Sequence, residues 1–388
     1  MLPIKQGRDP FMKPPKMFDP DLYSDVRLPY LDAKTLPPWC YTSDEFFERE
    51  IERIFLHTWN FVAREDELPN AGDFLVLDMF GESIIVIRSS AGHINAFVNA
   101  CPHRGTRILS DQGHCRAMVC PYHGWTFDHD GRLKGARGME KTRQFDLNDH
   151  GLTPIRLESW DGFMFINFDH EAESLHEHLG DITEKFASYN LSDMVCVRRK
   201  EYDLKCNWKI FMENAMEDYH TPVVHRSSIG LQDTIPEITR GNWDSIRMES
   251  SKSIAVLPGE TTPFPHIKGL SGEPASGSYF TVIHPTTFFG STHDCMWFMQ
   301  ELPLGPDRTK LIVGSCFPRQ TVARDDFDEV VEKYYYRWDS SIPEDNAISE
   351  RQQAGLTSAF SKQGRLSSHE PIVHYIANWV LDRVLDDD

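Results

Sequence analysis

Short runs of β-branched and aromatic residues follow one another between about residues 73 and 168. Glycines lie between successive runs, where a chain that reverses direction often needs positive φ angles. The predicted strands are 74–78, 83–88, 94–98, 118–119 and 162–167. This pattern predicts a small all-β domain.

The chain before this stretch follows a different pattern. Residues 1–40 contain many prolines and show little periodicity, which predicts an extended arm. Thr42 and Glu45 have the spacing of a capping box, and apolar residues then recur at helical spacing through His57. We therefore expect an arm over 1–40, and a β-rich domain with this leading helix over 41–170.

Beyond residue 170, helical and strand patterns are mixed, which predicts an α+β domain over 171–388. A helix is expected from about Trp208 to Tyr219. Strands are expected at 279–283, 295–300 and 310–317, in an antiparallel sheet. Apolar stripes at 327–338 and 372–380 predict two closing helices.

Composition narrows the possible functions. The net charge of −19 argues against a general binder of nucleic acid, which needs clustered Lys and Arg side chains. No apolar run approaches the roughly 18 to 20 residues of a membrane-spanning helix, and no export signal is evident, so we expect a cytoplasmic location. Eight cysteines in such a chain indicate free thiols and metal ligands rather than disulfides.

The strongest chemical signal is a pair of short motifs, Cys101-Pro-His103 and Cys120-Pro-Tyr-His123. Each offers one thiolate and one imidazole, so two facing loops could present four ligands. Two Cys on one iron and two His on the other is the ligand set of a Rieske [2Fe-2S] cluster. A structural zinc site uses the same ligand types, but it usually groups the two Cys together and the two His together. Cys115 lies between the motifs, outside the pattern, and is expected to be structural.

A second candidate site contains His220 and His225. Residues five apart do not share a face of a regular helix. Pro222 disfavours helical geometry at the preceding residue, so we expect the helix to kink or end there and to return His225 beside His220. With a carboxylate, the pair would form the 2-His-1-carboxylate set of non-haem Fe(II) oxygenases. Taken alone, the pair is better interpreted as two structural histidines, and only the presence of the first motif reverses this preference.

Together these motifs resemble the α-subunits of Rieske non-haem iron oxygenases, also called ring-hydroxylating oxygenases, from about Trp39 to the C-terminus. The resemblance implies an N-terminal Rieske domain before a catalytic domain of helix-grip, START-like fold with an antiparallel sheet. It also implies a [2Fe-2S] cluster and a mononuclear Fe(II). The implied cluster ligands are Cys101, His103, Cys120 and His123, and the implied iron ligands include His220 and His225.

The third iron ligand in this family is an Asp at the start of a late helix, followed by Glu and Gln. That pattern falls on 341–352 and selects Asp345, with Pro343 suited to a first helical turn. The ordinary alternative is a carboxylate at a helix N-terminus, which is common without any metal. Glu344 and Asp339 are the other candidates.

Family members also carry an acidic residue three positions before the first iron-binding His. It links that His to a cluster His of the neighbouring subunit. Glu217 has this position and is expected to join His220 to His123 of the next chain in a homotrimer, as part of the catalytic machinery. Asp218, one residue on, is expected to be solvated, although a register shift would exchange the two.

The resemblance implies an oxidoreductase, the terminal component of a mono- or dioxygenase that uses O2 and a small organic substrate. A Glu at 217 is associated in this family with quaternary ammonium substrates such as choline, carnitine and betaines. Several aromatic residues on the predicted sheet could cage such a cation, or simply fill a core. They are Tyr279, Phe280, Phe288, Phe289, Trp297 and Phe298. Aromatic hydroxylation is the alternative activity, and a Rieske electron carrier without catalytic iron is the alternative class.

No G-x-G-x-x-G dinucleotide fingerprint is present. Reducing power must then come from a separate NAD(P)H-dependent reductase, directly or through a ferredoxin. Neither a nucleic-acid nor a membrane partner is expected. The sequence leaves open the exact substrate and regiochemistry, mono- versus dioxygenation, the reductase, a β-subunit and an oligomer larger than a trimer.

Overall fold

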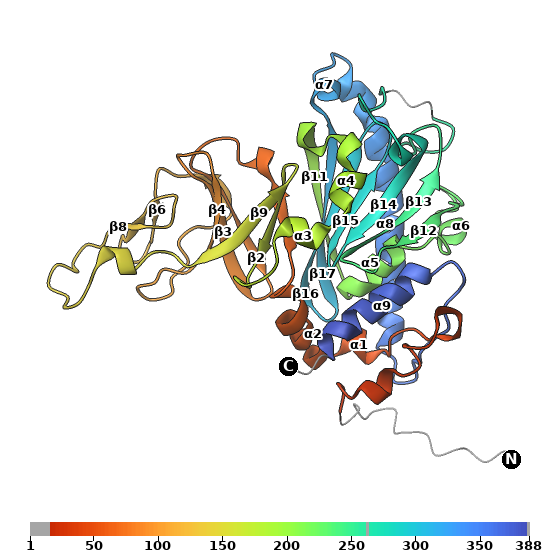
Figure 1. Cartoon of the computed structure of the whole chain (residues 1–388), viewed down its shortest axis with the longest axis horizontal. Helices are drawn as coiled ribbons and strands as arrows, with labels where there is room; N and C mark the ends of the chain where they lie inside the picture. The colour runs from red at the N-terminus through yellow and green to blue at the C-terminus, as the bar shows by residue number, and fades with distance from the viewer. Residues whose placement is uncertain (1–15, 261–263, 386–388) are drawn as a thin grey trace. The chain divides into compact units, whose positions relative to one another are not determined.

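The computed structural model describes residues 16–260 and 264–385. It contains two compact units (Figure 1). The β unit is Phe55–His178, and the large unit combines Met1–Ile54 with Leu179–Asp388. Among the described residues, no helix combines the length and apolarity needed to span a membrane.

The β unit is built on a seven-stranded antiparallel sheet, in the order β1-β10-β9-β4-β3-β2-β5. Its strands are β1 (Asn60–Arg64), β2 (Asp73–Met79), β3 (Glu82–Arg88), β4 (Ile94–Val98), β5 (Gln112–His114), β9 (Pro154–Trp160) and β10 (Phe163–Asn167). A three-stranded sheet follows the order β6-β7-β8, with β6 (Met118–Val119), β7 (Thr126–Phe127) and β8 (Leu133–Gly135). The all-β prediction and its five strands are confirmed. The pattern missed β1, β9 and the short strands β5, β7 and β8.

The large unit contains a second seven-stranded antiparallel sheet, in the order β11-β17-β16-β15-β14-β13-β12. Its strands are β11 (Met194–Leu204), β12 (Ile235–Ile238), β13 (Trp243–Glu249), β14 (Gly277–Ile283), β15 (Thr287–Ser291), β16 (Met296–Gly305) and β17 (Arg308–Pro318). The three predicted strands lie within β14, β16 and β17 or overlap them. This confirms the α+β class with an antiparallel sheet.

Helices complete the large unit. They are α1 (Trp39–Thr42), α2 (Asp44–Glu50), α4 (Ile182–Lys185), α5 (Trp208–Ala215), α6 (Thr221–Val224), α7 (Arg319–Val322), α8 (Phe327–Leu356) and α9 (Pro371–Val384). The short helix α3 (Leu175–Leu179) lies where the chain passes from one unit to the other. Short 3-10 turns and the π-helical turn Ile51–Phe55 connect these elements. The long helix α8 packs on the sheet through Trp338, whose ring lies 5.5 Å from that of Trp297 on β16.

The leading helix differs from the prediction in two ways. It begins at Asp44 with Ser43 as its N-cap, rather than with Thr42. It also belongs to the large unit and not to the β-rich domain. A fully buried ion pair of 2.6 Å between Glu50 on α2 and Lys209 on α5 fixes this placement, because neither charge tolerates burial without the other.

The arm is folded onto the large unit from residue 16 onward. Tyr23, Val26 and Ala33 are completely buried, and two 3-10 turns cover Pro20–Tyr23 and Tyr30–Asp32. The expectation of an extended arm is therefore wrong for residues 16–40, because the segment forms these turns and bonds to distant residues, such as Tyr30 to Ser367 and the carbonyl of Val26 to His374. Residues 1–15 lie outside the described part of the chain.

Two helix boundaries were also predicted wrongly. Helix α5 ends at Ala215, before Tyr219 and Pro222, and Pro222 lies in the first turn of the separate helix α6. Pro343 lies inside α8, which begins sixteen residues earlier at Phe327. Both errors reflect the double role of proline, which suits a first helical turn but can also be accommodated inside a long packed helix.

Candidate metal centres

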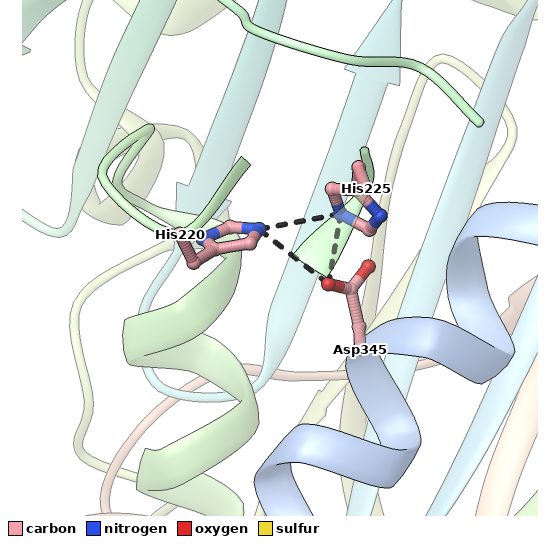
Figure 2. Close-up of side chains that lie close together, drawn as sticks. All are labelled: His220, His225 and Asp345. Atoms are coloured by element: carbon pink, nitrogen blue, oxygen red, sulfur yellow. Dashed lines mark hydrogen bonds and ion pairs between the residues drawn. The ribbon is translucent and has the colours of Figure 1, made fainter. Parts of the chain in front are cut away.

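Three side chains from distant segments meet in the large unit (Figure 2). His220 precedes α6 as its N-cap, His225 follows it as its C-cap, and Asp345 projects from α8. Their donor atoms all lie within 4.8 Å of one another. Oδ1 of Asp345 lies 3.0 Å from Nε2 of His225 and 3.5 Å from Nε2 of His220.

The other ring nitrogen of each histidine contacts a carboxylate. Nδ1 of His220 lies 2.6 Å from Oε1 of Glu217, and Nδ1 of His225 lies 2.8 Å from Oε2 of Glu344. A proton on each Nδ1 leaves each Nε2 directed towards Asp345 as a possible ligand atom. Sequence reasoning had named Glu344 only as a substitute ligand, and its contact with His225 was missed.

Electrostatics favour a cation among the three donors. Burial lowers the pKa of His220, but hydrogen bonds to Asp345 and Glu217 outweigh it and raise the pKa to about 9. Burial raises the pKa of Asp345, and the two histidines more than reverse this, so its pKa falls below the ordinary value. Burial likewise lowers the pKa of His225, but hydrogen bonds to Asp345 and Glu344 raise it above the ordinary value. These carboxylates favour positive charge among the three donors, which suits the site to a divalent ion.

The neighbouring carboxylates have other partners. Asp339 pairs with Arg198 and Lys200, away from the histidines. Asp218 is buried, and it accepts hydrogen bonds from the backbone and hydroxyl of Thr234 and pairs with His369. The expectation that Asp218 is solvated is therefore wrong.

These donors face a pocket with about 670 Å³ of empty space, counting the part that is open to solvent. Phe280, Phe288 and Trp297 line it, whereas the other three aromatic candidates do not. Tyr279 instead bonds to Glu273, and successive residues of a strand point to opposite faces of the sheet. Half of the predicted aromatic set therefore contributes to the pocket.

The two Cys/His motifs of the β unit form matching loops. The amide of Cys101 donates to the carbonyl of Thr106, and the amide of Cys120 donates to that of Trp125. Each loop then closes on a glycine with positive φ, Gly105 at 73° and Gly124 at 75°. A side chain at either glycine would strain the loop, which explains the shared Cys-to-Gly spacing.

The loop side chains fit a two-iron cluster. Cys101 and Cys120 are almost fully buried, and their thiols interact directly. The rings of His103 and His123 lie 4.6 Å apart, and the ring of His103 stacks on Trp125 at 4.8 Å. The loops thus bring two thiols and two imidazoles together. Cys115 lies outside this group and packs against the apolar cluster beneath it.

The comparisons with known proteins agree with both sites. Residues 58–146 match the Rieske [2Fe-2S] domain, and residues 191–386 match the ring hydroxylating alpha subunit (catalytic domain). The chain is 31% identical to the carnitine monooxygenase oxygenase subunit of Acinetobacter baumannii, over 86% of this chain and 88% of that protein. It is 28% identical to the glycine betaine monooxygenase oxygenase subunit of Chromohalobacter salexigens, over 90% of this chain and 86% of that protein.

A solved structure is similar across both units. The quaternary ammonium Rieske monooxygenase CntA in complex with γ-butyrobetaine has a TM-score of 0.78 and 27% identity, covering 93% of this chain and 98% of that one. The Rieske match also decides against a zinc site in the Cys/His loops. The chain therefore belongs to the ring-hydroxylating oxygenase α-subunit family, whose members combine a Rieske [2Fe-2S] cluster with a mononuclear iron.

Proposed function

We propose that this chain is the terminal oxygenase subunit of a system that monooxygenates an N-methyl group of a small quaternary ammonium compound. The observation that carries the proposal is the position of His220, His225 and Asp345 at a pocket lined by aromatic rings. The names of the similar proteins, which act on carnitine and glycine betaine, support the substrate class.

We assign His220, His225 and Asp345 as iron ligands, and Cys101, His103, Cys120 and His123 as cluster ligands. Iron held by the first set would supply the activation of dioxygen, and the cluster would store an electron. The protein's part is to bind and orient. Glu217 and Glu344 fix the two imidazoles, and Phe280 and Phe288 offer ring faces that attract an ammonium group.

Electrons must reach the iron site from outside this chain. We propose a homotrimer in which Glu217 connects His220 to His123 of the neighbouring subunit, with a separate NAD(P)H-dependent reductase as the source. Inter-subunit electron transfer has been described for the similar monooxygenase CntA. Two observations here support such contact. Tyr122 beside His123 is exposed, and so are the apolar side chains of Tyr219, Val223 and Leu231 around the iron site.

Turnover with a surrogate reductase tests the proposal. The purified, iron-loaded protein should consume O2 and release an oxidised product with carnitine, γ-butyrobetaine, betaine or choline. The His225→Ala variant, which lacks one assigned ligand, should form no product. Oxidation of benzoate-like substrates alone would instead establish aromatic hydroxylation. If no product forms from either group of substrates, the proposed substrate class is refuted.

A further inference from the structure

Arg337 is a buried cation in the wall of the substrate pocket. It lies on α8, and only 4% of the residue is exposed. Its Nε–H donates to the backbone carbonyl of Ile254 at 2.9 Å. The remaining four N–H groups of the guanidinium have no hydrogen-bond or ion-pair partner within residues 16–260 and 264–385.

The charge of Arg337 persists despite this burial. Burial lowers its pKa to about 10, so the guanidinium remains protonated at neutral pH. It lies 5.0 Å from the ring centroid of Trp297, and this cation–π contact offsets part of the cost of removing the charge from water. A full offset requires an anion with hydrogen-bonding oxygens.

Asp345 is the carboxylate whose charge acts on Arg337, but its oxygens are engaged by other groups. Asp345 is bonded to His220, His225 and the amide of Asn214. An Fe(II) ion held by two neutral imidazoles and one carboxylate would leave those four groups with a net positive charge. The metal-loaded site therefore increases the need for an anion near Arg337.

The pocket is electrically polarised along α8. Arg337, Ser341 and Asp345 are spaced four residues apart, share one face of the helix and all line the pocket. Eight residues of helix span about 12 Å. The carboxylates of Glu217 and Asp218 also line the pocket, on the segment that leads into the iron ligands. Negative groups thus gather at the iron end, and the guanidinium of Arg337 lies just over two helical turns away along α8.

We propose that Arg337 binds the carboxylate of a zwitterionic substrate, so that this enzyme acts on trimethylammonium carboxylates and discriminates against analogues with an uncharged tail. The planar guanidinium suits a bidentate contact with a carboxylate. Anchoring the tail there places the N-methyl groups at the iron end of the pocket. The inference rests on the proposed function and names the feature of the substrate that this pocket selects.

The test compares two substrates that differ only in the tail charge. γ-Butyrobetaine and its primary amide share the ammonium group and the chain length. We expect the wild-type enzyme to prefer the acid by roughly 100-fold in kcat/KM, because truncating a buried hydrogen-bonded charge pair has an effect of this size. Calorimetric titration of the same two compounds should show the same preference in Kd, independently of turnover.

Variants then assign the preference to Arg337. Arg337→Gln should lower kcat/KM for the acid by roughly 100-fold and change that for the amide by less than about threefold. Arg337→Lys should restore part of the preference, because it keeps the charge without the bidentate geometry. Arg198→Gln is the matched control. Arg198 pairs with Asp339, which lies on α8 like Arg337, but Arg198 does not line the pocket. Its replacement should therefore leave the preference for the acid unchanged.

The outcomes separate the two proposals. Equal use of the acid and the amide by the wild-type enzyme would overturn the role of Arg337 while leaving the proposed function intact, and this comparison needs no variant to fold. Equal losses for both compounds in Arg337→Gln would overturn it as well. Oxidation of neither compound, nor of carnitine, betaine or choline, would refute the proposed function, and the inference with it.

Discussion

Oε1 of Glu217 lies 2.6 Å from Nδ1 of His220, and Oε2 of the same carboxylate accepts the backbone N–H of His220 at 3.1 Å. One side chain thus fixes both the ring and the backbone of a proposed iron ligand. The carboxylate is about 10% exposed, so it retains an outer edge that a second partner can reach. Glu217 can therefore contact His220 on one side and, in the proposed trimer, His123 of the neighbouring subunit on the other.

Replacing Glu217 with Gln tests that bridge. The amide keeps the size of the side chain but removes its charge, so with Fe(II) supplied in excess both metals should be bound while product formation slows by roughly 10- to 100-fold. Iron and sulfide content checks that both centres are present. The rate at which a pre-reduced cluster is reoxidised in the presence of substrate measures electron transfer. Turnover at the wild-type rate would remove Glu217 from the electron path.

Glu344 should control the affinity for iron. It orients His225 and also accepts from the hydroxyl of Ser228. Glu344→Gln is expected to weaken iron binding roughly 10- to 100-fold, since partners of metal-bound histidines typically have this influence. Asp339→Asn is the control, because Asp339 is a carboxylate of the same helix that pairs with Arg198 and Lys200 instead. Equal iron affinities in the two variants would contradict the assignment.

The cysteines of the β unit should separate into ligands and packing residues. Cys120→Ser should abolish the Rieske absorption and electron paramagnetic resonance signals, because it removes a cluster thiolate. Cys115→Ser should preserve both, since Cys115 packs on the apolar cluster and lies outside the two matching loops. Loss of the Rieske signals in Cys115→Ser, together with their retention in Cys120→Ser, would reverse the ligand assignment.

Buried Glu213 predicts a pH dependence of stability. Burial raises its pKa to about 8, and the bond from Tyr41 and the charge of Lys209 only partly oppose this. Between the ordinary glutamate pKa of 4.5 and about 8, the folded state binds more protons than the unfolded state. Stability therefore falls as pH rises through this window and levels off above it.

Glu213→Gln removes the titrating group and should flatten that decline. The wild-type loss has an upper bound of about 5 kcal/mol, because each pKa unit corresponds to about 1.4 kcal/mol. Urea unfolding of both proteins at pH 5, 6, 7 and 8 measures the difference. Parallel curves for the two proteins would show that Glu213 does not carry the effect.

The parts of the fold that could be predicted from sequence are those with local signals. The Cys101 and Cys120 loops could be recognised because each motif contains its ligands and its closing glycine within a few residues. The β-rich region was evident because its strands alternate with glycines. The missed strand β7 is as short as the predicted strand β6, so length alone does not explain why it was missed.

Features set by tertiary packing were missed. Pro343 was assigned to a helix start, because sequence alone does not show that packing around Trp338 carries α8 through it. Arg337 had no local signal, since only the folded pocket shows a buried arginine that pairs with no carboxylate among the described residues. The contact between Glu344 and His225 likewise joins segments far apart in the chain.

Metal analysis shows whether one chain builds two separate iron centres. Iron and acid-labile sulfide should be quantified in the wild-type protein and in Asp345→Ala, with the Rieske resonance recorded for both. We expect three irons and two sulfides per wild-type chain. The variant should retain two irons, two sulfides and an unchanged Rieske signal. A wild-type chain with only two irons, or a variant that keeps three, would contradict the assignment of two separate iron centres.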